Sequence, residues 1–271
     1  MSYITLDKHN LAGEHICCGI SDKKSRESYE MKKAWLGERF DEGYVFRKLD
    51  ERAKVFIEYG PAEHAWVPVD APGYLILGCF WVSGRFKQSG HGKALLASAL
   101  EDARKQGKAG LAAITGKKKF HFMSDGAWLK RQGFTVADST EDGFELLVLS
   151  AAEPAAETAN EPGGGNTSPV TMPVSPVFRD SVKTGKVPGE DGISVLYSHR
   201  CVFTDYHVTR SLKESAEKRG IPLHITRIES REQARDACSP ATLFSMYYNG
   251  RFVTTDVSAC MDSRIDKFLK S

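Results

Sequence analysis

The sequence predicts an α/β protein made of two units joined by a linker. Strand-like and helix-like segments alternate along its 271 residues. Residues 79–82 have the pattern of a buried strand, and they run through a glycine-rich loop into an amphipathic helix. Residues 151–175 are rich in Ala, Glu, Pro, Gly, Thr and Ser. Because such a segment buries too little apolar surface to order itself, it is expected to be a flexible linker between residues 1–150 and residues 176–271.

The composition is typical of a soluble globular protein. Hydrophobic residues make up 41% and charged residues 27%, and the net charge of +2 gives no reason to expect a nucleic acid partner. No apolar run is long enough to span a membrane, and the N-terminus lacks the pattern of a secretory signal. The 6 cysteines show no C-x-x-C or C-x-x-H spacing, so no metal site is expected. Reduced thiols in the cytoplasm are the expectation that follows.

The first unit is expected to hold one helix before its central strands and two helices after them. Ser25 precedes the first helix and is predicted to cap it. The spacing of apolar residues defines the elements. Strands are expected at 3–6, 44–49, 54–59, 74–82, 111–115, 134–137 and 144–149, with a short strand or extended loop at 66–69, and helices at 25–40, 90–106 and 124–132.

The second unit is expected to begin with a strand and to end with a helix. Asn249-Gly250 is a strong signal for a hairpin turn between its last two strands. Strands are expected at 193–197, 223–228, 242–248 and 251–254, and helices at 206–219, 230–237 and 262–269.

The loop that follows the 74–82 strand has the features of an anion site. The first turn of a helix offers backbone N–H groups without partners, together with partial positive charge. Gly90 and Gly92 remove Cβ atoms from the path of a bulky phosphate, and Lys87 and Lys93 add positive charge. The loop therefore predicts a site for a phosphorylated ligand.

Neither of the two common phosphate loops fits this stretch. A Walker loop requires Ser or Thr where Ala94 stands, and a dinucleotide loop requires glycine where Leu95 stands. The pattern Lys-x-x-Gly-x-Gly-Lys-Ala resembles the pyrophosphate loop of the GNAT superfamily of acyl-CoA N-acyltransferases, usually (Arg/Gln)-x-x-Gly-x-(Gly/Ala), with Lys87 as the departure. Residues 128–134 resemble the last helix of that superfamily, and the order of elements agrees over about residues 10–150.

The resemblance implies a mixed, mostly antiparallel sheet with flanking helices, and acetyl-CoA as co-substrate. The strand 79–82 is expected to splay from the strand 111–115, so that a backbone N–H near Trp81 or Val82 polarises the thioester carbonyl. The lysines at 117–119 are candidates to lie near the 3′-phosphate, although solvated loop lysines are the better expectation. The residues expected to bind coenzyme A are Phe80, Trp81, Val82, Lys87, Gln88, Ser89, Gly90, His91, Gly92, Lys93 and Ala94.

The resemblance leaves the proton transfers open. The superfamily usually has a tyrosine as general acid in its last helix, and the alignment places Leu129 there, so another group, water or no group fills this role. The general base is a carboxylate or imidazole acting directly or through water, and the candidates are Glu58, His64 and Asp70. Strand alternation places Glu58 on the same face as Phe56, although a solvent-facing carboxylate is an equally good interpretation.

The second unit, with the order β-α-β-α-β-β-α, resembles the thioredoxin fold. Cys201 follows its first strand, and Ser239-Pro240 stands where that fold carries a cis-proline. Both halves together are similar to the YoaP-like acetyltransferases, in which a GNAT domain precedes a small thioredoxin-like domain. Relatives usually have proline where Val202 stands. The segments that carry this closer match are 15–18, 79–84, 144–149 and 201–204.

Cys201 is a candidate thiol site. A thiol at the start of a helix after a strand can have a lowered pKa, and His199 lies two residues before it. Dithiol exchange within one motif is excluded, because no second cysteine stands at C-x-x-C spacing. A monothiol role, a role in substrate recognition and a purely structural thiol all stay open.

The sequence therefore predicts an acetyl-CoA-dependent N-acetyltransferase whose second unit helps to bind the acceptor. The acceptor is an amine on a small molecule or on a protein, and the sequence does not distinguish between them. The alternative is an acyl-CoA-binding sensor that catalyses no reaction, with a monothiol redox or thiol-binding second unit. The missing tyrosine keeps this alternative open.

Overall fold

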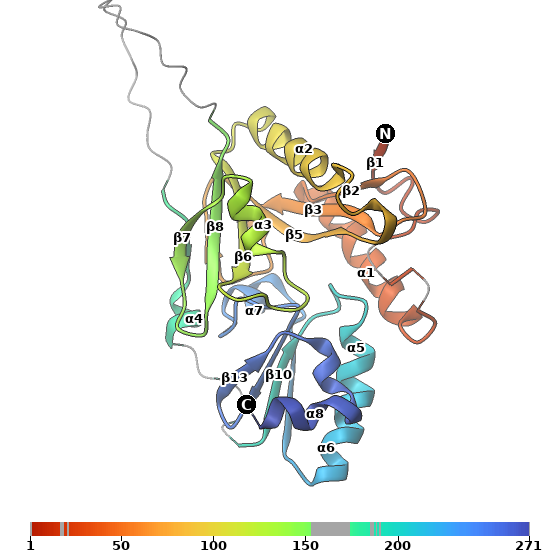
Figure 1. Cartoon of the computed structure of the whole chain (residues 1–271), viewed down its shortest axis with the longest axis vertical. Coiled ribbons are helices and arrows are strands. Elements are labelled where there is room, and N and C mark those ends of the chain that lie inside the picture. The colour runs from red at the N-terminus through yellow and green to blue at the C-terminus, as the bar shows by residue number, and fades with distance from the viewer. Residues whose placement is uncertain are drawn as a thin grey trace, which may run out of the picture.

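The computed structural model describes residues 2–16, 19–20, 22–152, 174–184, 187, 189 and 191–270. Cysteines 17 and 18 and most of the predicted linker lie outside these ranges. Two sheets dominate the described residues, and Figure 1 shows them one above the other, with the C-terminus in the lower unit. None of the helices in these ranges combines the length and the apolar character that crossing a bilayer requires.

The upper sheet has seven strands. They are β1 (Tyr3–Thr5), β2 (Val45–Leu49), β3 (Val55–Pro61), β5 (Tyr74–Val82), β6 (Gly110–Gly116), β7 (Thr135–Ser139) and β8 (Phe144–Ser150). Their order is β1-β2-β3-β5-β6-β8-β7, and all neighbours are antiparallel except β5 and β6. The expected mixed, mostly antiparallel sheet is therefore confirmed.

Helices cover both faces of the upper sheet. α2 (His91–Lys105) and α3 (Gly126–Arg131) pack on one face against apolar residues of β3, β5, β6 and β8. α1 (Arg26–Arg39) packs on the opposite face. Ser25 stands at the N-cap of α1, but its hydroxyl donates to Asp22 instead of capping the helix, so the predicted cap is wrong. Short 3-10 turns occupy Phe40–Glu42, Ala62–His64, Gly84–Phe86 and Val257–Cys260.

The lower sheet has four strands. They are β10 (Ile193–Tyr197), β11 (Leu223–Arg227), β12 (Phe244–Tyr248) and β13 (Arg251–Thr254), in the order β11-β10-β12-β13. β10 is parallel to β11 and antiparallel to β12. The expected order of elements is confirmed, whereas the likeness to thioredoxin stays a prediction. The described residues contain no cis peptide bond, so the bond before Pro240 is trans and the expected cis-proline is absent.

The helix expected at 206–219 begins earlier and is irregular. Ser230 caps α7 by accepting a hydrogen bond from the N–H of Gln233. A π-helical stretch, His207–Leu212, separates α5 from α6. The helices after the predicted linker are α4 (Asp180–Thr184), α5 (Thr204–Tyr206), α6 (Lys213–Arg219), α7 (Arg231–Arg235) and α8 (Asp262–Leu269).

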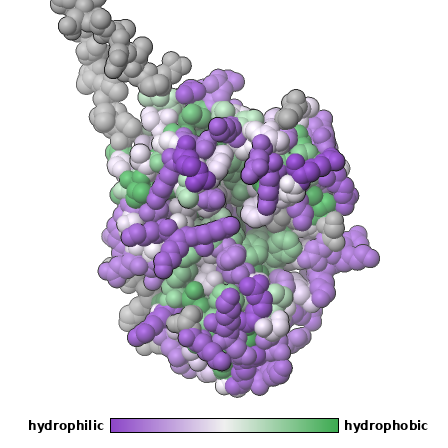
Figure 2. All heavy atoms as spheres, in the orientation of Figure 1, coloured by the Kyte–Doolittle hydropathy of each residue, from purple (hydrophilic) through white to green (hydrophobic). Residues whose placement is uncertain are grey.

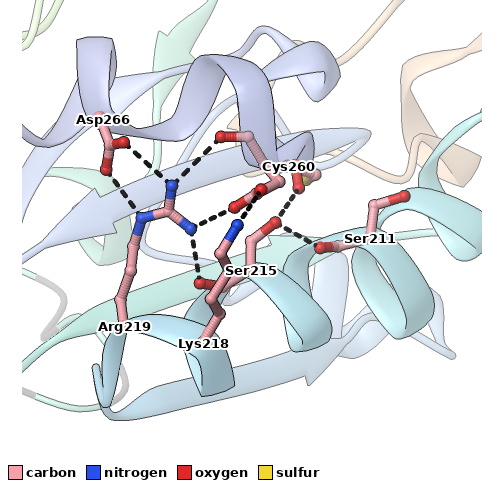
Figure 3. A network of polar contacts seen from close by, with 7 residues as sticks. Ser211, Ser215, Lys218, Arg219, Cys260 and Asp266 are labelled. Atoms are coloured by element: carbon pink, nitrogen blue, oxygen red, sulfur yellow. Dashed lines mark hydrogen bonds and ion pairs between the residues drawn. The ribbon is translucent and has the colours of Figure 1, made fainter.

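Polar contacts fasten α8 and the turn before it to α6, as Figure 3 shows. Arg219 donates through Nε and Nη2 to the two carboxylate oxygens of Asp266, at 2.7 and 2.9 Å, and through Nη1 to Asp262. The hydroxyl of Ser215 donates to the carbonyl of Cys260. Because a two-pronged arginine–carboxylate contact is directional, these bonds orient the two helices relative to each other.

The second unit packs on the face of the upper sheet that also carries α1. One hydrophobic core joins Trp35 of α1 and Phe56 of β3 to Val202 and Tyr247 of the second unit. Figure 1 shows α5 directly beneath α1, and the two helices are in contact. The upper sheet is therefore covered by α2 and α3 on one side and by α1 and the second unit on the other.

The chain returns to the first unit before it enters the second. β9 (Val177–Phe178) pairs antiparallel with β4 (Val69–Asp70). Asp70 also forms ion pairs with Arg179 and with Arg235 of α7. β9 falls within the predicted second unit but is bound to the first, and the position of the domain boundary stays a prediction.

We expect Gly110→Ala to destabilise the protein strongly. A Cβ at this position would lie 2.0 Å from the backbone oxygen of Leu149, and that oxygen cannot move aside without disturbing the β6·β8 ladder. Overpacking costs about 1–3 kcal/mol, so we expect a loss in the free energy of unfolding at the top of that range or above it. Denaturant unfolding followed by circular dichroism measures the loss.

Gly13→Ala is the matched control for this substitution. The nearest atom to a Cβ there is 3.9 Å away, so a change within about 0.5 kcal/mol is expected. Equal unfolding free energies for the two variants would contradict the packing of β6 against β8.

Candidate active site

The strands β5 and β6 diverge along their length. They pair in parallel near their beginnings, and the last pair is Ile76–Ala112. From Leu77 onward the edge of β5 that faces β6 has N–H and C=O groups that β6 does not satisfy. This is the splay that the sequence predicts for residues 79–82, and it begins two residues earlier.

β5 carries one residue more than β3 beside the splay. Ile57 pairs with Phe80 and Tyr59 pairs with Leu77, so three steps along β5 face two along β3. Because side chains alternate along a strand, the extra residue exchanges the two faces of β5. Leu77 and Phe80 both contact the core beneath α2, whereas Cys79 packs on the side of α1 and the second unit.

A pocket of about 640 Å³, which we term the loop pocket, lies between the glycine-rich loop, β5 and α3. Trp81, Ser89 and Ala94 do not line it. Trp81 points to the other face of β5 and is 47% exposed. The Ser89 hydroxyl donates to the carbonyl of Phe86, and the Ala94 N–H donates to the carbonyl of Gly90. The other eight predicted coenzyme A residues line the pocket: Phe80, Val82, Lys87, Gln88, Gly90, His91, Gly92 and Lys93.

The mouth of the loop pocket is suited to an anion. Gly90 has φ +85° and precedes α2, whose first backbone bond runs from Ala94 to Gly90. The N–H groups of residues 91–93 consequently have no partner within the helix. Lys87 and Lys93 are exposed, and neither forms an ion pair with a described residue. The lysines at 117–119 are exposed and do not line this pocket.

Aromatic contacts fix the start of α2. The hydroxyl of Tyr3 lies 2.8 Å from Nδ1 of His91, and the imidazole also meets the ring of Phe86 edge to face. His91 is 3% exposed, so its ring acts as an anchor. A Cβ at Gly92 would lie 3.2 Å from the ring of Trp128, which explains the need for a small residue there.

A second pocket lies across the splay and is bounded by both units. We term this space of about 120 Å³ the interface pocket. Phe80 and Ser124 line both pockets, so the two meet where β5 and β6 diverge. Figure 2 shows hydrophobic surface gathered at the level where the two units meet. The residues that line the interface pocket include Cys79, Trp81, Ile114, Arg200, Cys201 and Thr242.

Glu58 lies in the core beside the extra residue of β5. Its Oε1 is 2.5 Å from Nζ of Lys32 on α1, and the hydroxyl of Tyr44 donates to its Oε2 at 3.0 Å. Glu58 is 2% exposed, so the solvent-facing interpretation is wrong, and the predicted face shared with Phe56 is confirmed. Burial, reinforced by the charge of Glu58, raises the pKa of Tyr44 well above its ordinary value, so this phenol stays protonated.

The sequence does not single out Tyr44 or Ser124. A Cβ at Gly78 would lie 2.6 Å from the Tyr44 hydroxyl, so this glycine makes room for the phenol. Tyr44 and Gly78 also line a narrow cavity of about 30 Å³ next to the interface pocket. Leu129 is buried and lines the loop pocket, where the resemblance expects a tyrosine. Tyr44 reaches Glu58 across the β2–β3 hairpin, in which Phe46 pairs with Glu58, so the register of that hairpin is the signal that could have found it.

The other two predicted base candidates lie apart from Glu58. His64 is exposed, lines the narrow cavity, and has its Nδ1 2.9 Å from Nη1 of Arg231. Asp70 is bound in the ion pairs with Arg179 and Arg235, away from both pockets. Of the three candidates, Glu58 is the one that is buried, whereas Asp70 is held in ion pairs with residues that follow the predicted linker.

Cys201 faces the first unit. It is 8% exposed and lines the interface pocket together with Cys79 of β5. Burial lowers the pKa of the neighbouring His199, and the positive charges of Arg227 and Arg200 lower it further. The thiol role of Cys201 stays a prediction, but any such role operates at the interface pocket.

Comparison with known proteins gives a match over the whole chain. The chain is 38% identical over 270 residues to the protein named "Uncharacterized N-acetyltransferase YoaP" of Bacillus subtilis (strain 168). The alignment covers 100% of this chain and 98% of that protein. A family model described as YoaP-like matches residues 222–267.

Solved structures resemble part of the chain at lower similarity. The PaiA N-acetyltransferase from Thermoplasma acidophilum, in complex with coenzyme A, is 16% identical with a TM-score of 0.36, covering 55% of this chain and 99% of that one. The ribosomal-protein-S18-alanine N-acetyltransferase from Escherichia coli is 16% identical with a TM-score of 0.35, covering 59% and 99%. At these scores the likeness carries no argument about activity.

We expect Lys32→Met to destabilise the protein by about 3–5 kcal/mol, because it leaves the buried carboxylate of Glu58 without its counter-charge. Denaturant unfolding measures the effect. Lys33→Met is the matched control, since Lys33 is half-buried on the same helix and forms no ion pair with a described residue. Adding Glu58→Gln to Lys32→Met is expected to restore much of the loss. If the double variant is no more stable than Lys32→Met, the buried ion pair is not the cause.

Proposed function

We propose that this chain, which belongs to the YoaP family of N-acetyltransferases, transfers an acetyl group from acetyl-CoA to an amine bound between its two units. The observation that carries the proposal is the pair of pockets that meet at Phe80 and Ser124, one beside an anion-binding loop and the other beside a buried carboxylate. A donor in the first pocket and an acceptor in the second approach each other through the splay of β5 and β6.

The loop pocket is proposed to hold acetyl-CoA. The pyrophosphate lies on the N–H groups of residues 91–93, with Lys87 and Lys93 beside it. The pantetheine arm pairs with the free edge of β5, which β6 leaves unpaired from Leu77 onward. A backbone N–H of this edge near Trp81 or Val82 donates to the thioester carbonyl and stabilises the negative charge that develops on its oxygen.

The reaction needs one proton removed and one supplied. The amine nitrogen attacks the thioester carbon, the C–S bond breaks, and the amine loses a proton. Glu58 is the proposed base, and Tyr44, which donates to it, relays the proton from the acceptor beside Gly78. Ser124 stands where both pockets meet and is proposed to donate a hydrogen bond to the leaving thiolate. The thiolate then takes its proton from water, because a serine hydroxyl is a much weaker acid than a thiol. With Leu129 in place of the tyrosine, no side chain is assigned as general acid.

The second unit is proposed to complete the acceptor site. It supplies Arg200, Cys201 and Thr242 to the wall of the interface pocket. Because Cys79, Trp81 and the second unit close this side of the splay, the acceptor contacts both units at once. The acceptor is proposed to be a small molecule or the tip of a side chain, since the pocket measures about 120 Å³.

Acetyl-CoA is expected to raise the melting temperature of the protein. Saturation at 100 times the dissociation constant stabilises the folded state by about 2.7 kcal/mol. Gly90→Asp should abolish the shift, because Gly90 faces open space and the substitution places a negative charge at the anion site. Gly90→Asn is the matched control of the same shape without charge. Absence of a shift in the unmodified protein would refute the assignment of the loop pocket.

Coenzyme A is expected to be released from acetyl-CoA in the presence of a suitable amine, as measured by thiol detection across an amine panel. Glu58→Gln should lower kcat by roughly 100-fold or more, because general base catalysis contributes about that much. Tyr44→Phe should also lower kcat while leaving the acetyl-CoA melting shift intact. Glu30→Gln, an exposed carboxylate on α1, is the control. Binding of acetyl-CoA without turnover of any amine would instead support the acyl-CoA sensor.

A further inference from the structure

Arg200 is a buried cation for which the described part of the chain provides no anion. It lies between β10 and α5 and is 9% exposed. Its Nη1 donates to the carbonyl of Trp66 at 2.7 Å and to the hydroxyl of Thr242 at 3.1 Å. No carboxylate in the described ranges forms an ion pair with it, and its Nε is buried without a hydrogen-bond partner. Within the described ranges no hydrogen bond from Nη2 is found either, so the edge that Nε and Nη2 form is unused by these residues.

The other buried charges of this region are already matched. Lys32 and Glu58 form an ion pair with each other. Arg39, which lies over the same Trp35 ring as Arg200, is paired with Glu38 and Glu42. Arg200 is therefore the one of these three cations that contacts no carboxylate of the described residues. Burying an unmatched charge is costly, so this arrangement is suited to a ligand that brings a negative charge.

Arg200 stands where such a ligand would reach the reacting groups. It lines both the interface pocket and the narrow cavity, and so does Gly78, beside which the Tyr44 hydroxyl lies. The charge of Arg200 also acts on Tyr44, which places the two groups within electrostatic reach. The remaining walls of the interface pocket are largely apolar, with Phe56 and Ile114 among them.

We infer that the acceptor is a small amine that carries a carboxylate and an otherwise apolar body, and that Arg200 binds this carboxylate through its Nε and Nη2 edge. Two parallel N–H groups of a guanidinium match the two oxygens of a carboxylate. The amine then points toward Gly78 and the splay, where Tyr44 and Glu58 take up its proton. The inference rests on the proposed acetyl transfer and assigns the substrate class of the same site.

The experiment compares matched acceptors on the full-length protein. Alanine, β-alanine and 4-aminobutyrate are each paired with the corresponding amide, and 1-aminoethylphosphonate is added. Coenzyme A release gives kcat/KM, and the melting shift of the protein saturated with coenzyme A gives binding without chemistry. At least one acid should exceed its amide by roughly 30-fold or more in kcat/KM, because the amide leaves a buried charge unpaired.

Variants of Arg200 test whether this residue causes the preference for an acid over its amide. Arg200→Gln should remove the discrimination between acid and amide, and it should leave the acetyl-CoA melting shift unchanged. Arg200→Lys keeps the charge without the two-pronged edge and should restore only part of the discrimination. Arg251→Gln, an exposed arginine of the same unit, is the control and should keep the full preference. The comparison of acid with amide needs no variant, so it holds even if a variant does not fold.

The outcomes separate the two proposals. Turnover of amides as fast as acids overturns the carboxylate inference and leaves the acetyl transfer standing. Absence of turnover with every amine overturns the acetyl transfer, and the binding measurement then decides whether Arg200 selects carboxylates. A preference for the phosphonate over alanine contradicts a carboxylate site. Full discrimination in Arg200→Gln would show that another group binds the acid.

Discussion

The extra residue in β5 is the constraint on which the rest of the site depends. It lies between Leu77 and Phe80, opposite Glu58 on β3. By exchanging the faces of β5, it sends Phe80 and Val82 toward the loop pocket and Cys79 and Trp81 toward the second unit. A regular strand would place these four side chains on the opposite faces. The two pockets exist on either side of one strand because of this single irregularity.

The sequence predicts the parts of the site that local patterns determine. The strand 74–82, the glycine-rich loop and the helix after it follow from alternation, turn chemistry and helical spacing, and each is found within one or two residues of its expected position. The placement of Trp81 with Phe80 and Val82 in one binding set illustrates the limit. Side chains alternate along a strand, so Trp81 points to the face opposite Phe80 and Val82. A set of binding residues taken from consecutive positions therefore mixes the two faces of the strand.

What the sequence does not reveal depends on contacts between distant segments. Tyr44 reaches Glu58 from the residue before β2, and Arg200 reaches the splay from the second unit. No spacing rule links these positions. Asp70 shows the converse, since a carboxylate near the expected cleft in sequence is engaged by Arg179 and Arg235 in space. The thioredoxin resemblance drew attention to Cys201, whereas its neighbour Arg200 has the more distinctive surroundings.

The two pockets share a boundary at Phe80 and Ser124, and this boundary bears on the order in which the donor and the acceptor bind. Phe80 and Ser124 form a wall common to both pockets, so a donor held against them in the loop pocket would border the contents of the interface pocket. An acetyl group held there would exclude water from the region around Arg200. In the proposed reaction a bound donor thus becomes part of the surroundings of the acceptor, and we expect the affinity for the acceptor to be lower in the free protein than in the donor complex.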